Sequence, residues 1–216
     1  MKKAKGRTAL GGALRVALGG AVLVAMGACT TPDEKEDIAK IEHKCAACHG
    51  VNGKNDASFF PRLAGQQKDY IAAELKLFQD HSRADPYAHG FMWGMAAGLN
   101  DQTIDRLAAD YAAQTPLPGV AGDPAAVEAG RKIYMKGIPE QNVPICASCH
   151  GDHALGAPAQ AGNPTYPRLA GQHRIYLENQ MAGFASNARA NKIMHQNVLN
   201  LSEDQIHQVA TYLAAQ

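Results

Sequence analysis

The sequence lacks an excess of basic charge, a long uninterrupted apolar run, and any alternation of apolar and polar residues. It has 21 Lys and Arg against 20 Asp and Glu, so nothing favours a nucleic-acid-binding protein. The apolar stretch near the N-terminus is interrupted by glycines and by Arg15, which makes it unsuited to a membrane-spanning helix. Because no segment shows the period-two pattern of a half-buried strand, we expect an all-α chain.

Cysteine is scarce and unevenly placed. Of the five cysteines, four fall in two C-x-x-C-H motifs, Cys45–His49 and Cys146–His150, and the fifth is Cys29. Disulfides are the usual use of cysteine in an exported protein. Here no cysteine is left over for a disulfide or for any other role.

The N-terminal segment is typical of an export signal. Basic residues come first, an apolar stretch follows, and Gly27 and Ala28 stand directly before Cys29. We predict a lipoprotein-type signal peptide over residues 1–28, lipidation of Cys29, and a tether over 29–36. Simple cleavage with a free Cys29 is the alternative. The predicted location is the periplasm, with the lipid holding the protein to a membrane. Removing the five basic residues of the signal leaves 16 basic and 20 acidic residues, a formal charge of −4.

The rest of the chain is a duplication. The segment "PRLAGQ" at 61–66 recurs unchanged at 167–172, and the two C-x-x-C-H motifs are 101 residues apart. Internal repeats of this kind indicate tandem homologous units. We place the first unit over 37–114 and the second over 125–216. A linker rich in Pro and Gly occupies 115–124.

Each unit repeats the same amphipathic helices. A polar cap opens the final helix of each unit: Asn100 in the first, and in the second Ser202, which forms a capping-box pattern with Gln205. Units this short, with few large aliphatic residues, have thin cores and usually need a cofactor; a large flat apolar group would fill the gap. The apolar stripes at helical spacing are Ile71, Leu75, Phe78 and Ile104, Leu107, Tyr111 in the first unit, and Leu177, Met181, Phe184 and Ile206, Val209, Leu213 in the second.

The C-x-x-C-H motif is a signal for covalent haem attachment. On a first helical turn, positions i and i+3 share one face, so two thiols can reach the two vinyl groups of one porphyrin. The histidine that follows lies under the ring and can bind the iron. We predict two haem c groups: one on Cys45, Cys48 and His49, the other on Cys146, Cys149 and His150. A zinc ion held by the four thiolates is the alternative.

The opposite face of each iron needs a sixth ligand. Met92 lies 43 residues after His49, and Met194 lies 44 residues after His150. This near-equality within a duplicated frame predicts Met92 and Met194 as the axial ligands.

Other residues near these methionines are rival ligands. Met95 lies close to Met92, but the nearest position in the second unit is Val198. His89 and His195 would give bis-histidine haem, yet neither has a histidine at the matching position of the other unit.

The "PRLAGQ" segments are predicted to support the proximal histidines. In such sites the histidine donates its second ring N–H to a backbone carbonyl, and Pro61 and Pro167 are placed to provide that carbonyl. The neighbouring side chains are assigned as follows: Leu63 and Leu169 pack against the ring, and Arg62 and Arg168 either pair with haem propionates or are solvated.

These paired motifs resemble those of the dihaem cytochromes c of the cytochrome c4 family, over roughly residues 37–216. The resemblance implies two class I cytochrome c domains related by a pseudo-two-fold axis, with His/Met ligation at both irons. It also implies electron delivery to membrane oxidases, commonly of the cbb3 type. Many members are soluble or loosely attached, so the predicted lipid at Cys29 is a departure.

We therefore predict a periplasmic electron carrier and not an enzyme, with no small-molecule substrate. Its predicted donor is a quinol-oxidising complex or another redox protein, and its predicted acceptor is a terminal oxidase. The alternatives are a relay subunit of a larger dehydrogenase or reductase and, less favoured, a dihaem peroxidase. A thiosulfate-oxidising cytochrome typically uses a cysteine ligand, and no cysteine remains to supply one.

Overall fold

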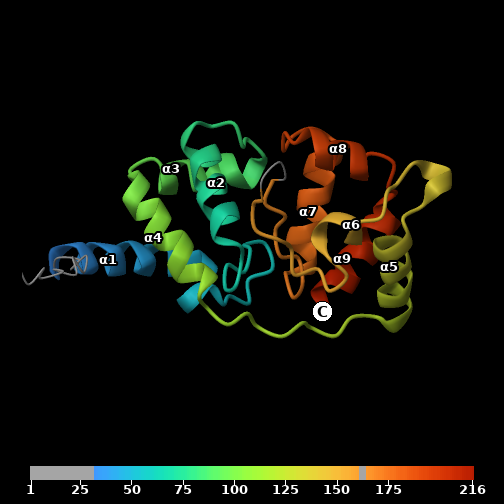
Figure 1. The fold of residues 1–216 in the computed structure, drawn as a ribbon, viewed down its shortest axis with the longest axis horizontal. Coiled ribbons are helices and arrows are strands. Elements are labelled where there is room, and N and C mark those ends of the chain that lie inside the picture. Colours follow the sequence, from blue (N-terminus) through green and yellow to red (C-terminus); the bar gives the residue numbers. More distant parts are fainter. Residues whose placement is uncertain (1–31, 161–163) are drawn as a thin grey trace, which may run out of the picture. The chain divides into compact units, whose positions relative to one another are not determined.

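The computed structural model describes residues 32–160 and 164–216 (Figure 1). The predictions made for the signal peptide and for Cys29 lie outside these residues. The regular secondary structure of the described residues is helical, and their only β-type pairings are two isolated bridges, Ile138–Val143 and Ala157–Tyr166. The all-α prediction is confirmed. None of the described helices combines the length and the apolar character needed to cross a membrane.

Two similar series of helices make up the described chain. The first half contains α1 (Pro32–His49), a 3₁₀ turn η1 (Val51–Gly53), α2 (Lys68–Gln79), a π-helical turn η2 (Ala88–Met92), α3 (Trp93–Ala96) and α4 (Asp101–Ala112). The second contains α5 (Pro124–Lys136), a 3₁₀ turn η3 (Pro139–Gln141), α6 (Ala147–His150), α7 (Arg174–Ala185), α8 (Lys192–Val198) and α9 (Glu203–Ala214). Residues 32–216 form one compact unit.

The predicted stripes and caps are confirmed. The predicted stripe residues of α2, α4, α7 and α9 are buried, apart from Leu75, which is partly exposed. The Asn100 side chain accepts a hydrogen bond from the Thr103 N–H at 2.8 Å, which satisfies a free donor at the start of α4. Ser202 and Gln205 form the expected capping box at the start of α9.

Two helices begin inside the predicted tether and linker. α1 starts at Pro32, inside the stretch predicted as a tether, and runs unbroken into the first C-x-x-C-H motif. α5 starts at Pro124, the last residue of the predicted linker, because Asp123 caps it and proline suits the first helical position.

The two halves differ most in how the N-terminal helix packs against the C-terminal one. α5 crosses α9 closely at Gly130, where a β-carbon would lie 2.0 Å from the Gln208 carbonyl oxygen. α1 packs far less extensively against α4, and its side chains before His49 are partly or fully exposed from residue 37 onward. The second half therefore has one continuous core, whereas the first has two small clusters, around Tyr111 and around Phe78.

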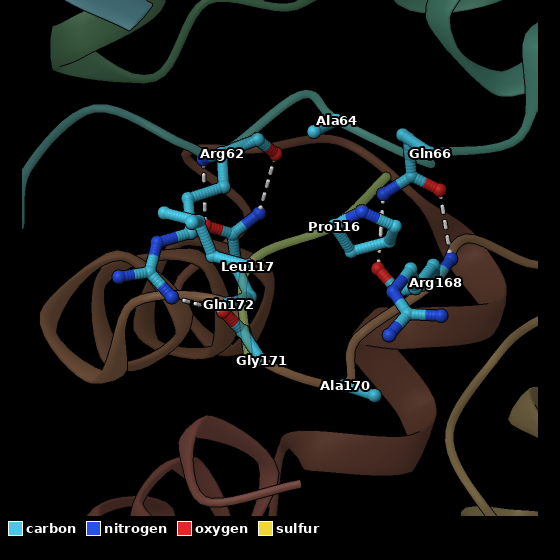
Figure 2. A pocket seen from close by; sticks show the side chains of 9 residues that line it. All are labelled: Arg62, Ala64, Gln66, Pro116, Leu117, Arg168, Ala170, Gly171 and Gln172. Atoms are coloured by element: carbon cyan, nitrogen blue, oxygen red, sulfur yellow. Dashed lines mark hydrogen bonds between the residues drawn. The ribbon is translucent and has the colours of Figure 1, made fainter. Parts of the chain in front are cut away.

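The "PRLAGQ" segments join the two halves (Figure 2). The Gln172 side chain accepts from the Arg62 N–H at 2.8 Å and donates to the Arg62 carbonyl at 2.9 Å. The Gln66 side chain makes the same pair of hydrogen bonds to Arg168, at 2.7 and 2.9 Å. Each glutamine thus pairs with the backbone of the other half, which gives the interface a two-fold, self-complementary arrangement.

Candidate haem-binding sites

The two C-x-x-C-H motifs lie in helices of very different length. In the first half the motif forms the last turns of the long helix α1. In the second half Cys146 caps the one-turn helix α6, which ends at His150. The expectation of a first helical turn is therefore wrong for the first motif, because α1 has no break before it. All four motif cysteines are partly buried.

Each proximal histidine is held in one tautomer by a backbone carbonyl. The Nδ1 atom of His49 lies 2.9 Å from the Pro61 oxygen, and Nδ1 of His150 lies 3.2 Å from the Pro167 oxygen. A carbonyl oxygen can only accept, so Nδ1 carries the proton and the lone pair of Nε2 is available to a metal. Burial lowers the pKa of both histidines and so favours the neutral form that iron needs.

A tight turn after each motif brings the proline carbonyl to the histidine. The Gly53 carbonyl accepts hydrogen bonds from the N–H groups of Leu63 and Ala64 at 3.0 and 3.3 Å. In the second half the Ala154 carbonyl accepts from Leu169 at 2.8 Å and from Ala170 at 3.0 Å. Leu63 and Leu169 are partly buried and pack against the same cores as Cys45 and Cys146, respectively.

The predicted methionine ligands occupy equivalent segments. Met92 ends the π-helical turn η2 and packs beside Phe78, and Met194 lies in α8 against the second core. Met95 is 43% exposed. The rival His195 donates its Nδ1 proton to the Phe184 carbonyl at 2.8 Å, and His89 is exposed.

An apolar surface lies beside each imidazole, as a porphyrin requires. The Phe60 ring meets His49 edge-on at 6.2 Å, and Tyr166 meets His150 in the same way at 6.1 Å. Phe91 extends the first surface, with its ring 5.5 Å from that of Phe60 and half of its own surface exposed. Both sites therefore offer an aromatic ring beside the imidazole against which a flat apolar group can pack.

The two arginines predicted for haem propionates differ. Arg62 donates to the carbonyl of Gly171, in the other half, at 2.9 Å and to that of Asn55 at 3.3 Å. Arg168, in contrast, has a buried Nε atom with no hydrogen-bond partner among the described residues. A buried donor left unpaired is costly. An anionic group such as a propionate would satisfy it.

The zinc alternative has no support in the described part of the chain. There, no group of three or more His, Cys, Asp or Glu side chains is arranged to hold a metal ion.

Comparisons with known proteins identify the family. A family model for cytochrome c matches residues 36–109 and 127–216. Cytochrome c4 of Thiocapsa roseopersicina is 36% identical over 184 residues, which cover 84% of this chain and 91% of the relative. The chain is a dihaem cytochrome c of the cytochrome c4 family. The solved cytochrome c4 of Acidithiobacillus ferrooxidans superposes with a TM-score of 0.72 at 35% identity, covering 81% of this cytochrome and 99% of that chain.

A further relative has a different name. The "thiosulfate dehydrogenase electron acceptor" of Thiomonas intermedia is 34% identical over 178 residues, or 80% of this cytochrome and 78% of the relative. Membership of the cytochrome c4 family makes this chain an electron carrier. Its two cytochrome c domains each bind one covalent haem c, on Cys45 and Cys48 and on Cys146 and Cys149.

Sequence reasoning missed the role of the two glutamines. Gln66 and Gln172 are the last letters of the repeated "PRLAGQ" segment, whose earlier residues were assigned to the haem. One signal in the sequence could have revealed this role: the two copies of the segment are identical up to and including the final glutamine. An amide retained in both copies can serve a contact between the copies, which haem packing does not require.

Proposed function

We propose that this cytochrome carries electrons in the periplasm, tethered by a lipid on Cys29, from a quinol-oxidising complex or similar donor to a terminal oxidase of the cbb3 type. The observation that carries the proposal is the equivalence of its two sites. In each, an imidazole oriented by a proline carbonyl is matched by a methionine segment, so the chain's own residues would supply both ligands of a bound haem iron. A fully coordinated iron takes up and releases electrons without binding a substrate.

We further propose Met92 and Met194 as the sixth ligands. Bound haem supplies one-electron chemistry, in which the iron alternates between Fe(III) and Fe(II). Thioether ligation raises the reduction potential, which suits donation to a high-potential acceptor. The partly buried position of Met92 in the Phe78 cluster favours it over the exposed Met95.

The near-infrared charge-transfer band of the oxidised protein tests this ligation, because it reports methionine sulfur on Fe(III). The variants Met92→Ala and Met194→Ala should each remove about half of the band's intensity. Met95→Ala is the matched control and should leave the band unchanged. If Met95→Ala removes it and Met92→Ala does not, the assignment in the first half is wrong.

A second candidate function is suggested by the relatives named as electron acceptors of thiosulfate dehydrogenase. In this case the cytochrome would take electrons from a dehydrogenase, as a separate carrier or as a bound subunit. The two functions differ in the donor and not in the chemistry of the haem sites.

Stopped-flow absorbance with purified partners separates the two candidates. Oxidation of the reduced cytochrome by a cbb3-type oxidase, with no reduction by thiosulfate and its dehydrogenase, supports the first. Rapid reduction by the dehydrogenase supports the second. Mass spectrometry of the mature N-terminus tests the tether: the native protein should carry a diacylglyceryl group that the variant Cys29→Ser lacks.

A further inference from the structure

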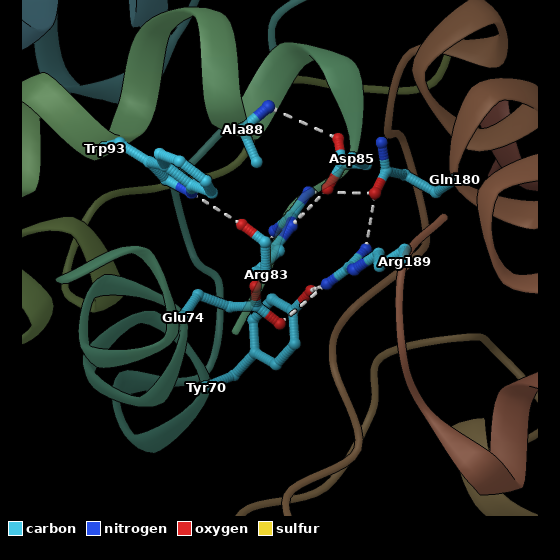
Figure 3. Close-up of polar contacts among 8 residues, drawn as sticks. All are labelled: Tyr70, Glu74, Arg83, Asp85, Ala88, Trp93, Gln180 and Arg189. Carbon is cyan, nitrogen blue, oxygen red and sulfur yellow. Dashed lines mark hydrogen bonds and ion pairs between the residues drawn. The ribbon is translucent and has the colours of Figure 1, made fainter. Parts of the chain in front are cut away.

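Two arginines are buried together where the halves meet (Figure 3). Arg83 follows α2 and Arg189 follows α7, at matching positions of the duplication, and they are only 7% and 6% exposed. Each guanidinium lies over a phenylalanine ring of its own half, Phe78 or Phe184, at 4.8 and 4.6 Å from the ring centre. Two buried cations in one place require negative charge nearby.

Glu74 on α2 bridges both arginines. One carboxylate oxygen accepts from Nη1 of Arg83 at 2.5 Å, and the other accepts from Nη2 of Arg189 at 2.6 Å. Gln180 occupies the matching position on α7, and its single amide oxygen accepts from Arg83 at 2.8 Å and from Arg189 at 2.6 Å. The four side chains close a ring across the interface, in which one position holds a carboxylate and its counterpart holds an amide.

The charge balance of the ring is uneven. Arg83 has a second carboxylate in its own half, because its Nε donates to Asp85 at 2.9 Å. Arg189 has Asn191 at the matching position. Its other partners in the described chain are neutral, namely Gln180 and the hydroxyl of Tyr70. Glu74 is therefore the one carboxylate that the described structure pairs with Arg189, and it belongs to the other half.

The carboxylate of Glu74 is ionised in this setting. Burial raises its pKa, but the coulombic effects of Arg189 and Arg83 outweigh burial and hold the pKa below its ordinary value. Separating the halves would leave Arg189 without its counter-ion. The contact therefore favours one docked arrangement over others.

We propose that Glu74 is a positioning residue that locks the two haem-binding halves together by neutralising Arg189 across the interface. The inference rests on the proposed function as a dihaem carrier, because a fixed spacing of the halves gives the two haems a fixed spacing for electron exchange. Docking of the halves then requires one carboxylate in the ring, and this carboxylate can belong to either half.

A charge swap tests this requirement in the haem-loaded protein. The variant Glu74→Gln makes the ring symmetric and leaves Arg189 without a carboxylate partner. It should shift the equilibrium between docked and separated halves toward separation by about 150-fold or more, as breaking a buried ion pair does. The double variant Glu74→Gln/Gln180→Glu returns a carboxylate to the position that already contacts both arginines, so it should restore docking.

Docking is measured by small-angle X-ray scattering, and electron exchange between the haems by transient absorbance after reduction of a fraction of the protein by a light pulse. Glu74→Gln should expand the particle and slow the exchange, and the double variant should reverse both effects. Glu178→Gln is the matched control: Glu178 lies on α7 but pairs with Arg174 in its own half at 2.6 Å.

The outcomes are distinct. If Glu74→Gln stays docked with native exchange, or if the double variant remains separated while its haems are intact, the proposal fails. Should Glu74→Gln not fold, the double variant alone decides between these results. Failure of the native protein to exchange electrons with either partner system would overturn the proposed function while leaving native docking unaltered.

Discussion

Gly130 provides a sharp test of the contact between α5 and α9. A β-carbon at this position would lie 2.0 Å from the Gln208 carbonyl oxygen and 2.9 Å from the β-carbon of Tyr212. Ordinary contacts begin near 3.4 Å, so the helices would have to move apart by roughly 1.4 Å. Alanine gains about 1 kcal/mol of helix propensity over glycine. Overpacking typically costs about 1–3 kcal/mol, and the upper part of that range, about 2–3 kcal/mol, applies here because backbone atoms cannot rotate away as a flexible side chain can. We expect Gly130→Ala to lower the stability of the second half by about 1–2 kcal/mol.

Gly183 in α7 is the matched control. A β-carbon there would meet the β-carbon of Arg189 at 3.5 Å, an ordinary contact, so Gly183→Ala should stabilise by about 0.5–1 kcal/mol. In a chain of this size 1 kcal/mol corresponds to about 2–4 °C in Tm. Thermal unfolding of the haem-loaded variants, followed by circular dichroism, should therefore show shifts of opposite sign. A Tm for Gly130→Ala at or above that of the native protein would refute the close crossing.

Three further predictions concern the capping box of α9, the hydroxyl of Tyr134 and the carboxylate of Glu74. Ser202→Ala removes the capping box of α9 and should cost about 1 kcal/mol in urea unfolding, whereas a loss below the error of that measurement would contradict the cap. Tyr134→Phe removes the hydrogen bond from a buried hydroxyl to the Gly151 carbonyl, 2.7 Å long, and should cost about 1 kcal/mol by the same assay; an unchanged stability would show that the bond contributes nothing. Because the pKa of Glu74 is lowered in the folded protein, its contribution is complete above the ordinary value of about 4.3 and is lost as pH falls through the folded value. Scattering should thus show docked halves from pH 5 to 8 and separation only in stronger acid; loosening near neutral pH would contradict this.

The helices that sequence reasoning predicted are those with a strong local signal. Apolar residues at helical spacing define α2, α4, α7 and α9, and capping side chains mark where α4 and α9 begin. The π-helical turn before Trp93 carries neither signal, and the short helix α8 has only a capping side chain, Asn191, which accepts from the Met194 N–H. Only the spacing of the methionines in the duplicated frame pointed to these two segments.

The functional residues also divide into those with a local signal in the sequence and those without one. The cysteines and histidines are readable because haem attachment requires them within five consecutive residues. The proline carbonyls were also anticipated, since they follow each motif at similar positions in the repeat. The contacts between the halves were not anticipated, because Arg83 and Gln180 are 97 residues apart in the chain. No local pattern relates side chains at that distance.

The uneven ring at Glu74 has a consequence for how such a protein can be built. In a dimer of identical subunits, every side chain near the symmetry axis is present twice, so carboxylates there come in pairs or not at all. Joining both copies in one polypeptide removes that constraint, and Gln180 can stand opposite Glu74. A tandem chain can therefore place a single negative charge at a point where a symmetric assembly would have to place none or two.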